Sequence, residues 1–300
     1  MEFTKESLTL EQQLDLLIQR GIQCQDRQQA LHYLRHLNYY RLSGYWFPFE
    51  SNHAAHRFVS GTQFEDIINL YVFDRELRLL VMDVIERIEI SSRTGLAYWL
   101  SRKHGPHAHL SPDIFKEQER DWHRQQLDKL KEDMRRRKHE VFVHHYSNKY
   151  DEPLPPLWVT VEIMSLGQLS MWYGKLRYRA DRNAIAHRYD MDEGNFGSFL
   201  HHLTIVRNLC AHHSRLWNHE FTFKLKLPKH RPKELVKSLN PDNNRRIYNT
   251  LTTCAWLIDH ISLNHHWKQK LKGLLKRHEI NTDFMGFPQD FTEKPIWTAV

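Results

Sequence analysis

Apolar residues recur at intervals of three and four positions along most of the chain, which is the spacing of one face of an α-helix. The longest stretch of this kind is predicted over residues 64–99, and its apolar stripe contains Leu77, Leu80, Val81, Val84, Ile85 and Ile88. No alternating pattern of the kind typical of β-strands extends beyond a few residues. The pattern therefore predicts an all-α protein.

The first 60 residues are predicted to form a helical extension. Thr9 and Gln12 have the spacing of a capping box at the start of a helix, and Gly21 is a suitable stop. A second helix is predicted over residues 28–37. Six aromatic residues then fall within residues 39–49. Such a cluster either packs helices together or stacks nucleobases, and packing is the more frequent role.

Beyond the break at Gly105-Pro106, a long polar helical region is predicted over residues 115–150. Its run of cations, Lys131 and residues 135–138, fits either a solvated surface or a row of phosphates. Residues 151–156 form the clearest linker. Further helices are predicted over residues 157–173, 179–189, 195–218, 243–263 and 265–277. The pattern divides the chain into an N-terminal helical extension (1–60), a helical core (61–220) and a basic C-terminal helical segment (221–300), joined in one compact unit.

Composition narrows the kind of partner and the cellular location. Lys and Arg outnumber Asp and Glu by 43 to 36, and the net charge of +7 suits either a polyanion such as nucleic acid or ordinary solubility. The three cysteines are far apart, which excludes a disulfide framework or zinc ribbon and fits a reducing cytoplasm. No signal region and no run of roughly 18 apolar residues is found, so we expect a cytoplasmic protein that does not enter a membrane.

The residues with the most distinctive chemistry are 207–218, with the sequence RNLCAHHSRLWN. Arg207 carries a permanent charge that can hold a phosphate, and His212 can transfer a proton near neutral pH. Asn208 can orient the histidine or donate to a phosphate oxygen. RNA carries its own nucleophile, the 2′-hydroxyl, so a base, an acid and positive charge are sufficient to cleave it.

Helical geometry leaves this motif incomplete within one straight helix. If residues 195–218 are helical throughout, Arg207 and His212 point about 140° apart. Focusing both side chains on one phosphate requires a helix distortion, the reach of the long arginine side chain, or a second copy of the helix across a two-fold axis. The motif is interpreted as half of a shared site.

Arg207, the polar residue after it and His212 resemble the R-x4-H signature of the HEPN superfamily. The whole of residues 207–218 resembles its abortive-infection (Abi-like) branch. Three further segments resemble the same branch in the same order: NYYRLSGYWFPF at 38–49, IERIEISSRT at 85–94, and the segment that begins Leu157-Trp158 and ends Met164-Ser165-Leu166-Gly167. The similarity extends over residues 10–265.

The resemblance implies a HEPN helical bundle and a metal-independent endoribonuclease without a cofactor, whose site is assembled at an interface between two HEPN domains. It also implies a role in bacterial anti-phage defence or in a toxin–antitoxin system. Arg207, Asn208 and His212 are then the catalytic positions. The supporting positions are His213, Glu89 and Arg93.

The expected partners are RNA, as a cellular target and as a cognate non-coding RNA, and a second copy of the chain. The cations expected to bind RNA are Arg135, Arg136, Arg137, Lys224, Lys226 and Arg231. One alternative is a protein that holds a structured non-coding RNA without cleaving it. Another is a polar motif that only cross-links helices inside the bundle.

Two further features of the sequence concern histidine. Residues 182–187 (RNAIAH) repeat the R-N-x3-H pattern, but the weaker family resemblance around them favours coincidence. If the repeat were functional, one chain would carry two motifs and need no partner. The doublet His201-His202 precedes the motif by one to two turns and is interpreted as surface polarity.

Overall fold

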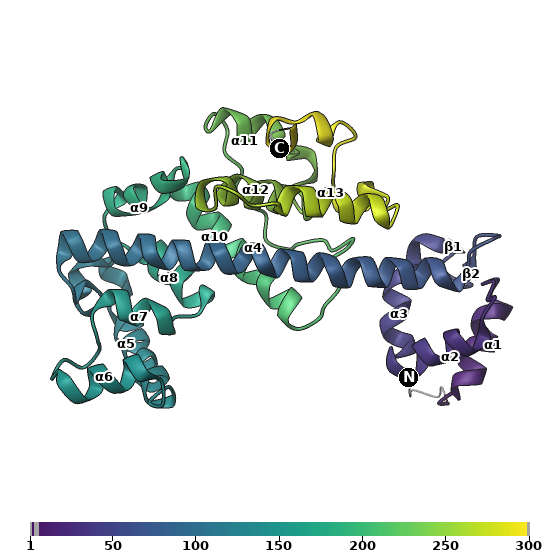
Figure 1. The fold of residues 1–300 in the computed structure, drawn as a ribbon, viewed down its shortest axis with the longest axis horizontal. Helices are drawn as coiled ribbons and strands as arrows, with labels where there is room; N and C mark the ends of the chain where they lie inside the picture. Colours follow the sequence, from purple (N-terminus) through teal and green to yellow (C-terminus); the bar gives the residue numbers. More distant parts are fainter. Residues whose placement is uncertain (1, 3–5, 299–300) are drawn as a thin grey trace. The chain divides into compact units, whose positions relative to one another are not determined.

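The computed structural model describes residues 2 and 6–298, and this part of the chain is mainly helical (Figure 1). Its α-helices are α1 (Leu10–Gln19), α2 (Arg27–His36), α3 (Tyr39–Trp46), α4 (Phe64–His104), α5 (Arg120–Arg136), α6 (Val141–Lys149), α7 (Leu157–Ile163), α8 (Leu166–Lys175), α9 (Arg179–Ala186), α10 (Glu193–Ala211), α11 (Lys233–Ser238), α12 (Tyr248–Ile261), α13 (Trp267–Arg277) and α14 (Pro295–Thr298). Two short strands, β1 (Glu50–Asn52) and β2 (Arg57–Phe58), pair in an antiparallel arrangement. The predicted all-α class is confirmed.

The chain folds into two compact units. The first unit contains the residues up to Arg78 together with Lys272–Ile280, and the second contains Leu79–Leu271 together with the residues from Asn281 onward. The predicted boundaries at residues 60 and 220 stay a prediction. Among the described residues, no helix combines the length and the apolar character required to cross a bilayer.

In the first unit, the predicted capping box at the start of the first helix is confirmed. Thr9 and Gln12 exchange the two hydrogen bonds of a capping box at the start of α1. Within residues 39–49, Tyr45 and Trp46 are buried, and the Tyr45 hydroxyl donates to the Asp74 carboxylate at 2.7 Å. These aromatic side chains therefore pack, whereas Tyr40 is 85% exposed.

In the second unit, the helix that carries the motif, α10, is held by its neighbours in the bundle. Helix α10 packs along α8 and α9 (Figure 1). Its apolar stripe is buried as far as the last turn, at Phe199, Leu203, Val206 and Cys210. Gly167 of α8 faces Thr204 of α10, and a Cβ at that position would be in ordinary contact with the Thr204 side chain, at 3.4 Å. The buried stripe determines which side of α10 faces solvent.

Two predicted helices are interrupted. The helix predicted over residues 157–173 is divided between α7 and α8, because Ser165 and Gln168 form a capping box that starts a new helix. The region predicted to be helical over residues 115–150 contains α5 and α6, with a turn after Arg136. Both breaks occur without a glycine or proline at the junction.

Candidate active site at the end of helix α10

Helix α10 ends at Ala211, so the prediction of a helix that continues to residue 218 is wrong. His213 has a φ angle of +56°, in the left-handed region. The Ser214 N–H donates to the Leu209 carbonyl at 2.9 Å, and the His213 N–H donates to the Cys210 carbonyl at 3.1 Å. This pair of bonds is a Schellman motif, which satisfies the last carbonyl groups of the helix and turns the chain away from its axis.

His212 is the C-cap residue and still follows the helical path. Its N–H donates to the Asn208 carbonyl oxygen at 2.9 Å, one turn earlier. Asn208 and His212 therefore share one side of α10, and the separation of about 140° between the directions of Arg207 and His212 persists. The early end of α10 does not by itself bring these two side chains together.

The motif residues Arg207, Asn208, Ala211, His212 and His213 are all exposed. Arg207 Nη1 donates to Asn208 Oδ1 at 3.3 Å. Within residues 2 and 6–298, the Arg207 guanidinium forms no ion pair and the His212 ring forms no hydrogen bond. A buried, fully paired His212 would indicate a structural role, and the structure shows the opposite.

Arg207 lines a hollow of about 450 Å³ together with Glu89 and Arg93 of α4, which we call the motif hollow. Glu89 and Arg93, four residues apart on α4, form an ion pair at 2.5 Å. Arg93 also donates to the Met164 carbonyl oxygen at 2.5 Å and lies 3.8 Å from Glu162. Arg93 thus connects α4 to α7 and to the turn that precedes α8.

The charges around the motif hollow are mixed. Two further carboxylates line it, from Asp83 and Glu86, so three carboxylates face two guanidinium groups. A phosphate placed there would be repelled unless more positive charge were supplied. Two large apolar side chains also line the hollow and are half exposed, Leu79 at 57% and Ile90 at 50%. Exposed apolar groups beside a polar site are typical of protein–protein contact surfaces.

The repeated pattern at residues 182–187 lies in a different environment. Arg182 Nη1 donates to the carbonyl oxygen of Leu176, and His187 is the exposed C-cap residue of α9. The preceding residue, Asp181, is fully buried and accepts hydrogen bonds from Trp99 (3.1 Å), Lys103 (2.5 Å) and His104 (2.8 Å). Burial alone would raise the pKa of Asp181, but these bonds hold it below its ordinary value.

Some of the cations expected to bind RNA gather next to this repeat. Lys226 and Arg231 line a hollow of about 760 Å³, which we call the basic hollow. Its other polar lining residues include Asn183, His187, Lys229 and His230, and also Asp190 and Asp192. Lys224 is exposed but is not among the residues that line it.

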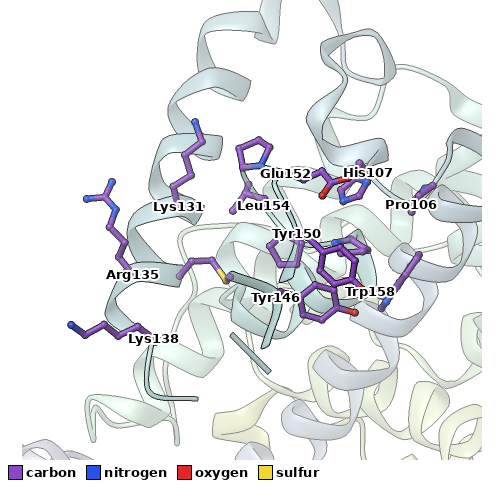
Figure 2. Close-up of a pocket in the computed structure, with 14 residues that line it drawn as sticks. Pro106, His107, Lys131, Arg135, Lys138, Tyr146, Tyr150, Glu152, Leu154 and Trp158 are labelled. Atoms are coloured by element: carbon purple, nitrogen blue, oxygen red, sulfur yellow. The ribbon is translucent and has the colours of Figure 1, made fainter. Parts of the chain in front are cut away.

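A third hollow, also of about 760 Å³, lies beside α5 and α6 (Figure 2). Of the predicted cations at 135–137, only Arg135 lines it. Arg136 lies 3.3 Å from Glu132, and Arg137 lies 3.7 Å from Glu140, both as exposed pairs. The rings of Tyr146, Tyr150 and Trp158 also line this hollow. The charge run in the sequence singles out the cations and not these rings. Two tyrosines four residues apart, just before a proline-rich linker, could have indicated them.

The histidine doublet before the motif is not simply surface polarity. His201 is exposed, but His202 is buried, and its Nε2 is hydrogen-bonded to Thr250 Oγ1 at 2.8 Å. Burial lowers the pKa of His202 to about 4. The interpretation of His202 as a surface residue is wrong, because this side of α10 faces α12.

Comparison with known proteins assigns the chain to a family. A family model described as Abi-like protein matches residues 32–218, more than half of the chain. The match includes the end of α10, the α4 segment with Glu89 and Arg93, and the turn between α7 and α8. No curated protein and no solved structure matches the chain. The chain therefore belongs to the Abi-like family, whose name indicates a function in abortive-infection defence.

Proposed function

We propose that this Abi-like protein is a defence endoribonuclease that cleaves RNA by attack of the 2′-hydroxyl. The observation that supports this most directly is the exposed cluster of Arg207, Asn208 and His212, in which the guanidinium forms no ion pair among the described residues. An exposed guanidinium and an exposed imidazole can supply the charge stabilisation and the proton transfer that cleavage of a phosphodiester needs.

The reaction has a balanced course that needs only these groups and the RNA. The 2′-oxygen forms a bond to phosphorus as its proton passes to a base, and the bond from phosphorus to the 5′-oxygen breaks. The leaving 5′-oxygen takes up a proton, and the products carry a 2′,3′-cyclic phosphate and a 5′-hydroxyl. Arg207 stabilises the extra negative charge on the non-bridging oxygens, and His212 transfers the proton.

A second copy of the chain completes the site in this proposal. Arg207 and His212 of one chain diverge around α10, and the motif hollow of one chain holds more carboxylates than guanidinium groups. A two-fold arrangement of α10 would place one His212 near the 2′-oxygen and the other near the 5′-oxygen, and would bring a second Arg207 to the phosphate. The half-exposed side chains of Leu79 and Ile90 offer apolar contact area for such a dimer.

The test is cleavage of total RNA in the presence of EDTA, with the 3′ ends of the products identified chemically. We expect His212→Ala to lower the rate by about 100- to 10,000-fold, the usual contribution of a general acid or base. The matched control is His266→Ala, which removes an exposed histidine that lines neither the motif hollow nor the basic hollow. Cutting by the His212→Ala protein at the rate of the unmodified protein would refute the proposal.

The alternative function is storage of a structured RNA without cleavage, and the basic hollow favours it. Lys226, Lys229 and Arg231 gather there in the second unit without help from the motif residues. Such a site supports phosphate contacts that do not depend on His212. Sequencing of RNA that co-purifies with the protein separates the two functions, because one discrete, intact RNA species would favour storage.

A further inference from the structure

The hollow beside α5 and α6 combines rings with positive charge, and we call it the aromatic–basic pocket. Lys131, Arg135 and Lys138 lie along one side, and the rings of Tyr146, Tyr150 and Trp158 lie beside one another across from them (Figure 2). Glu152 contributes the one carboxylate among the lining residues. Its volume of about 760 Å³ is within the range of sites that hold small organic groups.

The rings present usable faces to solvent. Trp158 is 50% exposed and Tyr150 is 46% exposed. Tyr146 and Tyr150 already stack on each other, with centroids 5.4 Å apart and planes inclined by 28°. The Trp158 ring forms no ring pair within the part of the chain that the structure describes. Trp158 is therefore the ring that can accept a further planar group.

The cations at the rim are only weakly neutralised by neighbouring carboxylates. Lys131 pairs with Asp128 at 3.2 Å and Arg135 with Glu132 at 2.9 Å, both as exposed pairs one turn apart on α5. Exposed pairs of this kind are weak and exchange readily for a stronger anion. Lys138 forms no ion pair among the described residues. In Figure 2 the charged ends of these side chains point away from the rings and toward the outside of the pocket.

The remaining wall of the pocket is stiff. It is formed by the segment around Leu154, in which Pro153, Pro155 and Pro156 each fix a φ angle. Leu154 is buried, and the Leu157 N–H donates to the Pro106 carbonyl at 2.8 Å. A preformed wall reduces the entropy lost when a ligand binds.

We propose that the aromatic–basic pocket binds one unpaired nucleobase of a single-stranded RNA, stacked on Trp158, with the adjoining phosphates on Lys131, Arg135 and Lys138. Rings inside and cations at the rim match the two parts of a nucleotide, which has an apolar base face and an anionic backbone. A proline-rich peptide would use the rings but would not use three cations, so the charge favours the polyanion. The inference rests on the proposed function, because it names a substrate contact outside the cleavage motif.

Contacts along α7 connect this pocket to the motif hollow. Trp158 also lines a further hollow of about 410 Å³ with Tyr98, Arg102 and Glu162. Glu162 is in turn 3.8 Å from Arg93, which lines the motif hollow. A single strand held by its base on Trp158 can therefore follow α4 toward Arg207. In this proposal the pocket holds unpaired RNA, and the strand continues from it toward Arg207.

The experiment measures binding separately from cleavage. The probe is a short single-stranded oligonucleotide in which 2′-deoxyribose removes the nucleophile and one 2-aminopurine reports stacking by loss of its fluorescence. We expect Trp158→Ala to weaken binding by about tenfold and to restore the fluorescence, because base–aromatic stacking contributes about 1–3 kcal/mol. Trp158→Phe should retain most of the quenching, because it keeps an aromatic ring, and an unchanged melting temperature of Trp158→Ala would exclude a folding defect.

A second variant tests the charge at the rim. Lys138→Ala should weaken binding uniformly across base sequences and reduce the slope of log affinity against log salt by about 0.7, the value for one phosphate contact in a single strand. The matched controls are Arg124→Ala, an exposed cation on α5 outside the pocket, and Tyr178→Ala, an exposed tyrosine outside it. Both should bind the probe as the unmodified protein does.

The outcomes separate the pocket from the proposed function. Pocket-dependent binding by a protein that never cuts RNA would support the pocket and refute the nuclease. Cleavage that depends on His212, with binding unchanged in Trp158→Ala and Lys138→Ala, would refute the pocket and leave the nuclease standing. Absence of probe binding by the unmodified protein, with binding of a proline-rich peptide instead, would also overturn the pocket proposal.

Discussion

Two segments of this chain carry the same R-N-x3-H pattern, and the structure treats them differently. At the end of α10, Arg207 and His212 are exposed, and the guanidinium faces a hollow without an ion pair among the described residues. At the end of α9, Arg182 donates to the Leu176 carbonyl and helps to hold the chain that leads into the helix. Both histidines are C-cap residues.

The difference teaches that the arginine, and not the histidine, distinguishes the two segments. His187 and His212 have equivalent places at helix ends, so spacing alone cannot rank them. The guanidinium of Arg182 is used by a backbone carbonyl, whereas that of Arg207 is available for a ligand. The buried carboxylate of Asp181 lies immediately before Arg182. The residue before Arg207 is the apolar Val206, which cannot anchor the chain in this way.

The largest expected effect comes from exchanging the two arginines for alanine. Arg207→Ala should lower RNA cleavage by about 100- to 1,000-fold, the usual loss when one donor to a developing oxyanion is removed, and should leave the melting temperature unchanged. Arg182→Ala should instead lower the free energy of unfolding by about 1–3 kcal/mol, because a charged donor to a carbonyl is lost. Equal effects of both variants on cleavage would break the comparison.

Asp181→Asn tests the anchoring of the second segment. The free energy of unfolding should fall by about 3 kcal/mol, because Lys103 and His104 lose the buried carboxylate that they share. Since the folded-state pKa of Asp181 is lowered, the carboxylate stabilises the fold above its ordinary value of 3.8 and loses this effect as the pH falls below it. Asp128→Asn, on the exposed side of α5, is the control in denaturant titrations.

His202, which is buried and is not part of the proposed catalytic site, should make the stability of the fold depend on pH. Its folded-state pKa of about 4 is below the ordinary 6.5, so between these values the unfolded chain binds a proton that the folded chain does not. Stability should therefore fall by up to about 3 kcal/mol as the pH drops from 6.5 to 4. His202→Gln should flatten this part of the curve, and an unchanged curve would contradict the assignment.

The smallest effect is expected at the turn that ends α10. His213 adopts a left-handed conformation that glycine adopts more easily, so His213→Gly should relieve about 0.5–1 kcal/mol of backbone strain in the turn. If His213 only forms the turn, cleavage should persist. A loss of cleavage with a gain in stability would instead make His213 part of the site, as the family resemblance implies.

Helix positions were predictable where an apolar stripe is long, and helix ends were predictable where glycine or proline marks them. Gly21 and Gly105 follow the ends of α1 and α4, and both have positive φ angles. The end of α10 was not predictable in this way, because histidine occupies the left-handed position that glycine usually fills. The break before α8 depends on a side-chain capping box at Ser165 and not on a helix breaker.

The candidate site was partly predictable for a similar reason. The Glu89–Arg93 pair follows from a spacing of four on one helix. The bond from Arg93 to the Met164 carbonyl, and the shared hollow of Arg93 with Arg207, join segments 71 and 114 positions apart. No local pattern reports on contacts of that kind. Arg135 and Arg136 both pair with Glu132, and only the side of α5 that faces the hollow decides that Arg135 lines the pocket and Arg136 does not.

The sequence by itself determined the all-α class, the family and the residue types that are suited to a phosphodiester. These properties depend on spacing and side-chain chemistry, which are local. Only the tertiary structure decided which of the two R-N-x3-H segments keeps an available guanidinium and which cations share a hollow with aromatic rings. Burial and charge pairing depend on neighbours brought from distant segments, as Trp99, Lys103 and His104 are brought to Asp181.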